Sequence, residues 1–212
     1  MREPLSVARI VGAAVEVADR DGLAAVSMRS VARELGVEAM SLYHHVAGKD
    51  SLLDALADRV YEQVELPEAA SGWREGTEAR AHSLRSVLAA HPWALGMVDT
   101  RTTPGPAVLR YYDATVGHLR GAGLSAVLAS RAFSAVDSYV FGFVLTEQNL
   151  PFDAASGAGE FAVGMEPALA EYPHLGALVR DLIAGGYQFS DEFEHGLALV
   201  LDSVAARVAA GE

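Results

Sequence analysis

Side chains that can contact bases or phosphates gather between positions 39 and 49 of this chain: Ala39, Met40, Ser41, Tyr43, His44, His45 and Lys49. The hydroxyls and imidazoles can hydrogen bond to base edges, and the two apolar side chains can meet a thymine methyl group. Lysine binds phosphate as a point charge, and the helix that opens at Gly48 would add free N–H groups beside it. The cluster therefore predicts contact with double-stranded DNA.

The segment before this cluster predicts a short amphipathic helix over residues 28–35. Val31 and Leu35 lie four apart on one face, and Ser27 can accept a hydrogen bond from a first-turn N–H group. Gly36 follows at the point where a helix C-terminus favours a positive φ. The chain is therefore expected to turn sharply after this helix.

A second short helix, over residues 39–45, is expected after the turn. The small side chain of Ala32 allows the two helices to cross closely, and Leu42 and Val46 are spaced to fill the crossing. Such a pair is either a DNA-binding helix-turn-helix or an ordinary αα-hairpin with a solvated polar face. Spacing alone leaves both interpretations open, because helix-turn-helix patterns are short and degenerate.

The stretch GVEAMSLYHHVAGKDSLLDALADRV, residues 36–60, resembles the helix-turn-helix and following helix of the TetR/AcrR family of bacterial transcriptional regulators, and more narrowly the tetracycline-repressor subgroup. LYHHV, the lysine and LLDALA are its most specific parts. The resemblance covers about the first 65 residues well and the remainder more loosely. It implies base or groove contacts from Arg29, Ala39, Met40, Ser41, Tyr43 and His44, with His45 and Lys49 nearer the phosphates.

The chain of 212 residues contains no cysteine and is 51% apolar. The absence of cysteine excludes a disulfide framework, thiolate metal sites and cysteine nucleophiles. Its longest apolar runs, such as residues 140–145, are too short to cross a bilayer, and the N-terminus lacks a signal-peptide pattern. A cytoplasmic protein without a membrane partner is expected.

The formal net charge of −12 is unevenly distributed. Residues 1–50 carry six Lys and Arg against seven Asp and Glu, whereas residues 51–212 carry ten against twenty-one. The acidic remainder would oppose every approach to DNA except one led by the N-terminal part. We therefore expect few phosphate contacts and a modest dependence of DNA affinity on salt.

Helical periodicity continues to the C-terminus, and the chain shows no run of alternating strands, so the fold class is all-α. An Asp191/Glu194 pair resembles a capping box, and small residues predict a loop over 151–159. Helices are expected over residues 5–21, 28–35, 39–45, 51–64, 73–88, 93–98, 108–119, 124–148, 174–184 and 191–209. The predicted domains are a three-helix helix-turn-helix DNA-binding domain (1–48), a connecting helix (49–66) and a larger ligand-binding and dimerisation domain (67–212).

The helices predicted over residues 124–148 and 191–209 are apolar on more than one face, so each is expected to be buried on more than one face. In the tetracycline-repressor subgroup that these segments resemble, two such helices form a four-helix bundle with a second subunit. A homodimer would place its two helix-turn-helix domains in successive major grooves about 34–36 Å apart on a palindromic operator. The alternative is a monomer with a well-filled core.

The same resemblance implies a small-molecule effector pocket in the larger domain. Its candidate residues are Leu84, Trp93, Met97, Thr100, Arg101, Tyr111, Phe133 and Asp137. Asp137 is the most informative, since an acid in a mostly apolar helix must reach solvent, a partner or a ligand.

One departure from the subgroup's sequence narrows the chemical class of the expected ligand. Where tetracycline repressors carry the histidine that holds the drug-bound magnesium, this chain has Met97, and Glu147 lies one position from an aligned acid. A thioether is a poor ligand for a hard cation. An apolar or aromatic effector is expected instead, with no metal and no cofactor.

These features predict a ligand-responsive repressor and not an enzyme. An all-α carrier or enzyme is the alternative from another class, although the seven histidines and the acids fall in no spacing that assembles a metal site or an acid–base pair. An activator of the same architecture is a further alternative, because the sequence does not distinguish the sign of regulation.

Overall fold

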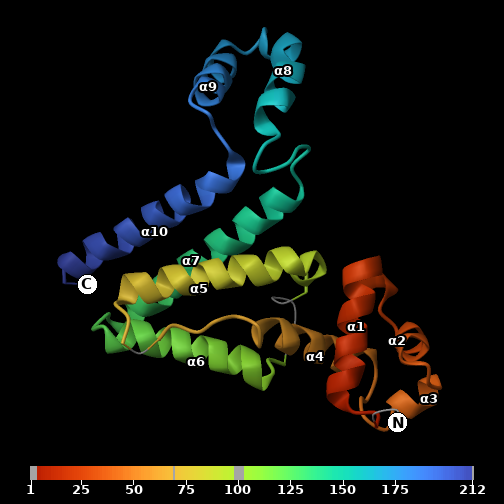
Figure 1. The fold of residues 1–212 in the computed structure, drawn as a ribbon. Coiled ribbons are helices and arrows are strands. Elements are labelled where there is room, and N and C mark those ends of the chain that lie inside the picture. Colours follow the sequence, from red (N-terminus) through yellow and green to blue (C-terminus); the bar gives the residue numbers. More distant parts are fainter. Residues whose placement is uncertain (1–3, 69, 98–102, 212) are drawn as a thin grey trace. The chain divides into compact units, whose positions relative to one another are not determined.

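The computed structural model describes residues 4–68, 70–97 and 103–211 (Figure 1). Within these ranges the chain forms ten α-helices joined by turns and short 3₁₀ segments, and no strand. This agrees with the predicted all-α class. The contacts between residues divide the chain into two compact units, Met1–Leu124 (the first unit) and Ser125–Glu212 (the second unit).

Three helices form the N-terminal part of the first unit, here called the head: α1 (Val7–Asp21), α2 (Met28–Leu35) and α3 (Ala39–Leu42). The hydroxyl of Ser6 caps α1 by accepting a hydrogen bond from the Arg9 N–H group at 3.3 Å. One face of α1 is buried at Ile10, Ala14 and Val17, three or four residues apart, and the helix packs against α2. The predicted apolar stripe thus forms the base of the head.

The turn between α2 and α3 follows the sequence-based prediction. The Ser27 hydroxyl accepts a hydrogen bond from the Ser30 N–H group at 3.1 Å, and the Ser30 hydroxyl accepts one from the Ser27 N–H group at 2.9 Å, which completes a capping box. Gly36 ends α2 in the left-handed region at φ 65°, and Val37 N donates to the Ala32 carbonyl at 3.0 Å. These bonds fix the sharp change of direction.

Helix α3 is shorter than predicted, because it ends at Leu42 and not at His45. The N–H groups of His45 and Val46 both donate to the Leu42 carbonyl at 2.9 Å, so the chain leaves the helix through a turn. Leu42 and Val46 are nevertheless buried, as is Ala32 in α2, and α2 packs against α3 as the spacing predicted.

The rest of the first unit consists of α4 (Lys49–Tyr61), α5 (Trp73–Ala90), the 3₁₀ turn η2 (Pro92–Ala94) and α6 (Pro106–Gly121). Helix α4 packs against both α1 and α6, and α5 packs against α6. Leu52, Leu56, Leu84, Leu88 and Leu119 are almost completely buried among these helices. Helix α4 therefore connects the head directly to the helices that follow it.

The second unit contains α7 (Ala126–Gln148), α8 (Ala158–Leu169), α9 (Pro173–Ala184) and α10 (Glu192–Ala209). Helices α7 and α10 pack along each other, and α8 packs against α9. By length and composition alone α7 could cross a membrane, and 44% of its most apolar window is buried inside the protein. A single helix of this kind is weak evidence for a membrane span.

Two local predictions in the second unit need correction. Helix α8 was not predicted, because its small residues and the internal Pro167 weaken the helical pattern. The predicted capping box at the start of α10 is wrong: the Asp191 side chain makes no capping bond. Asp191 has helical backbone angles at the end of a 3₁₀ turn, whereas a capping residue needs an extended backbone.

A pair of glycine substitutions tests the turn of the head. Gly36→Ala should lower the free energy of unfolding by about 1 kcal/mol, because alanine is strained at positive φ. Gly12→Ala should raise it by up to about 1 kcal/mol, because Gly12 lies inside α1 and a Cβ there meets nothing within 4 Å. Urea denaturation measures both free energies of unfolding. If the two substitutions changed the free energy of unfolding equally, the role of Gly36 in the turn would be contradicted.

Candidate functional site

The surface of α3 and the turn after it is divided between buried and exposed side chains. Leu42 and Val46 are 0% and 5% exposed, whereas Met40 is 72% and Tyr43 is 47% exposed. Large apolar and aromatic side chains left in solvent beside an ordered turn mark an interaction surface. The outer face of this turn is thus free to contact a partner.

The predicted DNA contacts share this outer surface to different degrees. Arg29, Met40, Tyr43, His44, His45 and Lys49 are exposed, and Ala39 and Ser41 are half-buried. Four of these residues lie on α2 or α3, and the other four lie on the turn after α3 or at the start of α4. The head brings them to neighbouring positions because α2 and α3 pack together.

Helix α4 adds an anion-favouring end to this surface. Gly48 directly precedes its first residue, Lys49, and among the described residues no side chain caps this end. Its first-turn N–H groups and the exposed Lys49 side chain therefore remain available to a phosphate.

One ion pair holds α1 to α2 at the edge of the head. Arg20 Nη2 lies 2.9 Å from Glu34 Oε2, and Arg20 also contacts Asp21 at 3.2 Å. Hydrogen bonds to Glu34, and then to Asp21, raise the pKa of the Arg20 guanidinium above its ordinary value. Since these groups are exposed, the pair orients the helices without adding much stability.

Three of the predicted effector-pocket residues are buried in the first unit. Tyr111, Leu84 and Met97 are 0%, 1% and 2% exposed. The Tyr111 ring lies 4.9 Å from the Tyr61 ring and 5.8 Å from the Tyr112 ring, centroid to centroid. These three tyrosines form an aromatic cluster between α4 and α6.

Arg80 is a buried cation beside this cluster that the sequence analysis did not identify. Its side chain is 1% exposed, its guanidinium carbon lies 5.2 Å from the centre of the Tyr111 ring, and Nη1 donates to the Tyr111 hydroxyl. Ring contact and hydrogen bonding compensate part of the cost of burying the charge. Arg80 lies three residues after Thr77 and four before Leu84, on the buried stripe of α5. This helical spacing was the sequence signal that could have predicted its burial.

The other predicted effector residues are dispersed. Trp93 is half-buried in the first unit, and its indole N–H donates to Asp19 in α1 at 2.5 Å. Phe133 and Asp137 belong to α7 in the second unit, where Asp137 is 7% exposed. Thr100 and Arg101 lie outside the described residues.

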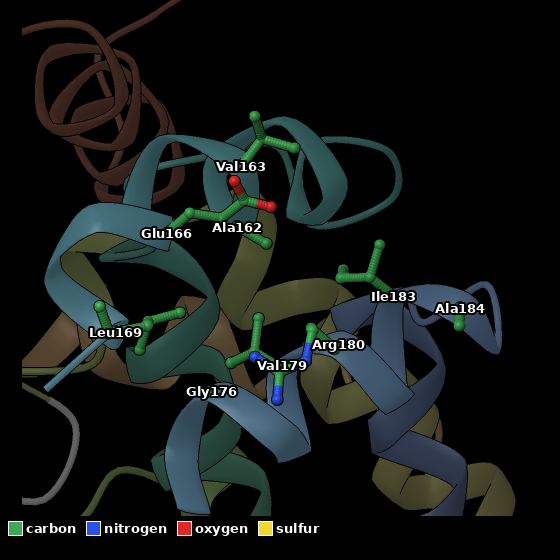
Figure 2. A pocket seen from close by; sticks show the side chains of 10 residues that line it. Ala162, Val163, Glu166, Leu169, Gly176, Val179, Arg180, Ile183 and Ala184 are labelled. Atoms are coloured by element: carbon green, nitrogen blue, oxygen red, sulfur yellow. The ribbon is translucent and has the colours of Figure 1, made fainter. Parts of the chain in front are cut away.

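A cleft of about 490 Å³ lies between α8 and α9 in the second unit. Its walls are mostly apolar, and Figure 2 shows Glu166 of α8 and Arg180 of α9 among the side chains that line it. None of the predicted effector residues lines this cleft. Within the described ranges, no group of three or more His, Cys, Asp or Glu residues could hold a metal ion.

Comparison with known proteins identifies the family. Residues 10–56 match the bacterial regulatory proteins of the tetR family, and residues 66–208 match the tetracyclin repressor-like C-terminal domain. The chain belongs to the TetR family. As a TetR-family member it is a soluble, ligand-responsive transcriptional repressor, so the enzyme alternative is wrong and the predicted family, fold class and function are confirmed.

Three relatives of this TetR-family chain illustrate the similarity. An HTH-type transcriptional regulator of Saccharopolyspora erythraea is 36% identical, over 93% of this chain and 84% of the relative. The HTH-type transcriptional repressor DrrR1 of Streptomyces coeruleorubidus is 33% identical, over 97% and 79%. The crystal structure of Streptomyces coelicolor ActR in complex with actinorhodin has a TM-score of 0.79 and 31% identity, over 99% and 100% of the two chains.

The buried Arg80 environment gives a stability prediction. Tyr111→Phe removes the hydroxyl that accepts the Arg80 hydrogen bond and should lower the free energy of unfolding by about 1–3 kcal/mol, since a buried charged donor loses an acceptor. Tyr172→Phe is the matched control, because Tyr172 is 60% exposed. Urea denaturation would contradict the assignment if both variants matched the wild type.

Proposed function

We propose that this TetR-family repressor binds a palindromic operator as a homodimer, and that an apolar or aromatic effector releases it. The observation that carries the DNA-binding part is the exposure of Met40 and Tyr43 beside the buried Leu42 and Val46. Only the outer side chains of the turn are free to read bases, while the inner ones hold the turn in place.

Each proposed DNA contact has a role that follows from its chemistry. Tyr43, His44 and Ser41 hydrogen bond to base edges or the groove, together with Arg29. Ala39 and Met40 offer apolar contact to a thymine methyl group. His45 and Lys49 lie nearer the phosphates, where Lys49 acts with the N-terminus of α4. The proposed DNA-binding domain is residues 1–48, with residues 49–66 as the connecting helix.

The proposed dimer interface is formed by α7 and α10, within the segments 124–148 and 191–209. Val127 and Leu145 on α7 are 58% and 55% exposed, and Leu199 on α10 is 73% exposed. Large apolar side chains on the outside of two long packed helices favour a partner that covers them. The larger domain, residues 67–212, would then carry both dimerisation and effector binding.

The proposed effector site in the first unit centres on Tyr111, Leu84 and Met97, with Arg80 beside them. Tyrosine rings offer stacking surfaces to a flat aromatic ligand, and the guanidinium offers donors to a carbonyl or phenolate oxygen. The complex of ActR with actinorhodin supports this ligand class. Trp93, Thr100, Arg101, Phe133 and Asp137 remain predicted contacts.

Release from DNA requires the effector to prefer the DNA-free conformation. A preference of roughly 10–100-fold is enough for a useful switch. The proposed site of action is the cytoplasm, where operator DNA is accessible.

Selection from a randomised DNA pool tests the operator. The bound fraction should contain a palindrome with half-sites about one helical turn apart, because each head reads one major groove. Tyr43→Ala and Lys49→Ala should each weaken binding to that palindrome by roughly tenfold, the loss of one good contact. Tyr172→Ala is the control, and wild-type affinity in both Tyr43→Ala and Lys49→Ala would remove this surface from the mechanism.

A single charge tests the dimer interface. Leu199→Lys should convert the dimer to a monomer, because the lysine would be buried without a counter-charge in the proposed interface between the two subunits. Leu109→Lys on α6 is the matched control, since Leu109 is also exposed, at 53%. Sedimentation velocity measures both, and a Leu199→Lys dimer would overturn the proposed interface.

A further inference from the structure

We propose that Asp19 and Asp58 are positioning residues that set the separation of the two heads on DNA. Each carboxylate belongs to a helix of the DNA-binding side, α1 or α4, and each binds one end of the connection between α5 and α6. All of these groups lie in the first unit. The inference rests on the proposed dimeric operator binding.

The Asp19 contact holds the start of the connection. Asp19 Oδ1 accepts a hydrogen bond from His91 Nδ1 at 2.8 Å and from the Trp93 indole N–H at 2.5 Å. Since a carboxylate only accepts, Nδ1 is the donor, and Nε2 on the other side of the ring lies 3.1 Å from the Gln63 amide nitrogen. The His91 side chain is only 11% exposed, so water competes weakly for its bonds.

The Asp58 contact holds the end of the connection. Asp58 Oδ1 accepts from the backbone N–H groups of Ala107 and Val108, at 2.7 and 3.1 Å. These are first-turn donors of α6 that have no partner inside their own helix, and a carboxylate at a helix N-terminus is favoured by the helix dipole. Ala107 and Val108 are 3% and 6% exposed, so the bonds are shielded from water.

Gly105 makes room for the Asp58 contact. Its φ of −77° suits any residue, so the backbone does not require glycine there. A Cβ at this position would instead overlap the Asp58 carboxylate. The absence of a side chain at position 105 therefore allows the carboxylate to reach the start of α6.

The Asp58 contact joins α4, which carries Lys49 at its start, to α6, which carries Tyr111. Tyr111 lies one helical turn after Ala107, and Lys49 lies nine residues before Asp58 in α4, about 13 Å along the helix. Apolar packing between helices tolerates sliding, whereas hydrogen bonds to a carboxylate fix direction and distance. A shift of the C-terminal end of α5 is therefore transmitted to α1, and a shift of the N-terminal end of α6 is transmitted to α4.

The test is the selectivity of the full-length dimer for half-site spacing. A role in stability alone would weaken binding to all operators equally, whereas a positioning role changes the ratio between spacings. The variants are Asp19→Ala, Asp58→Ala and Gly105→Ala, and Asp113→Ala on the exposed face of α6 is the charge-matched control. Alanine favours the helix at positions 19, 58 and 113, and Gly105→Ala displaces the Asp58 carboxylate without deleting it.

The dissociation constant is measured for the selected palindrome and for the same palindrome with one base pair inserted between its half-sites. For the wild type and Asp113→Ala, the dissociation constant for the longer DNA should exceed that for the selected palindrome by about tenfold or more. In the three variants this ratio of dissociation constants should fall to about threefold or less, a change within the usual range of coupling between sites. A wild-type ratio in Asp58→Ala and Gly105→Ala, whatever their absolute affinities, would overturn the inference. A wild type that selects no palindrome would instead refute the proposed function on which it rests.

Discussion

The anchoring of a helix of only four residues is the constraint on which the head depends. An isolated helix as short as α3 is unstable in water, so its position comes from tertiary packing. Leu42, with no exposed surface, contributes to the packing of α3 against α2, and the left-handed Gly36 turns the chain between the two helices. Met40, Tyr43, His44 and His45 are consequently exposed while Val46 stays buried, which gives the protein its proposed DNA-contacting surface.

Features governed by neighbouring residues were predictable from the sequence. The cap at Ser27, the turn at Gly36 and the buried stripe of α1 each depend on residues within one or two helical turns. Helix α8 was missed because glycine, alanine and Pro167 dilute its periodicity, and the end of α3 was missed because no glycine or proline follows Leu42 directly. Local patterns thus predicted most of the fold and failed where the local signal was weak or absent.

Contacts between distant residues explain the part of the site that the sequence did not reveal. The residues of the DNA-contacting surface follow one another along the chain, so a family resemblance could indicate them. Arg80 meets Tyr111 across 31 positions, and Asp58 meets Ala107 across 49. Periodicity can place Arg80 on the buried stripe of α5, but neither pairing leaves a trace in the sequence, because only the fold brings the partner helix near.

The exposed amine at the start of α4 has a chemical consequence of its own. Lys49 is the single lysine of the chain, since the other fifteen basic side chains are arginines. Any acylation of lysine side chains therefore falls on one position, beside the helix end that favours phosphate. Such a modification would remove the positive charge there and leave every guanidinium of the protein unchanged.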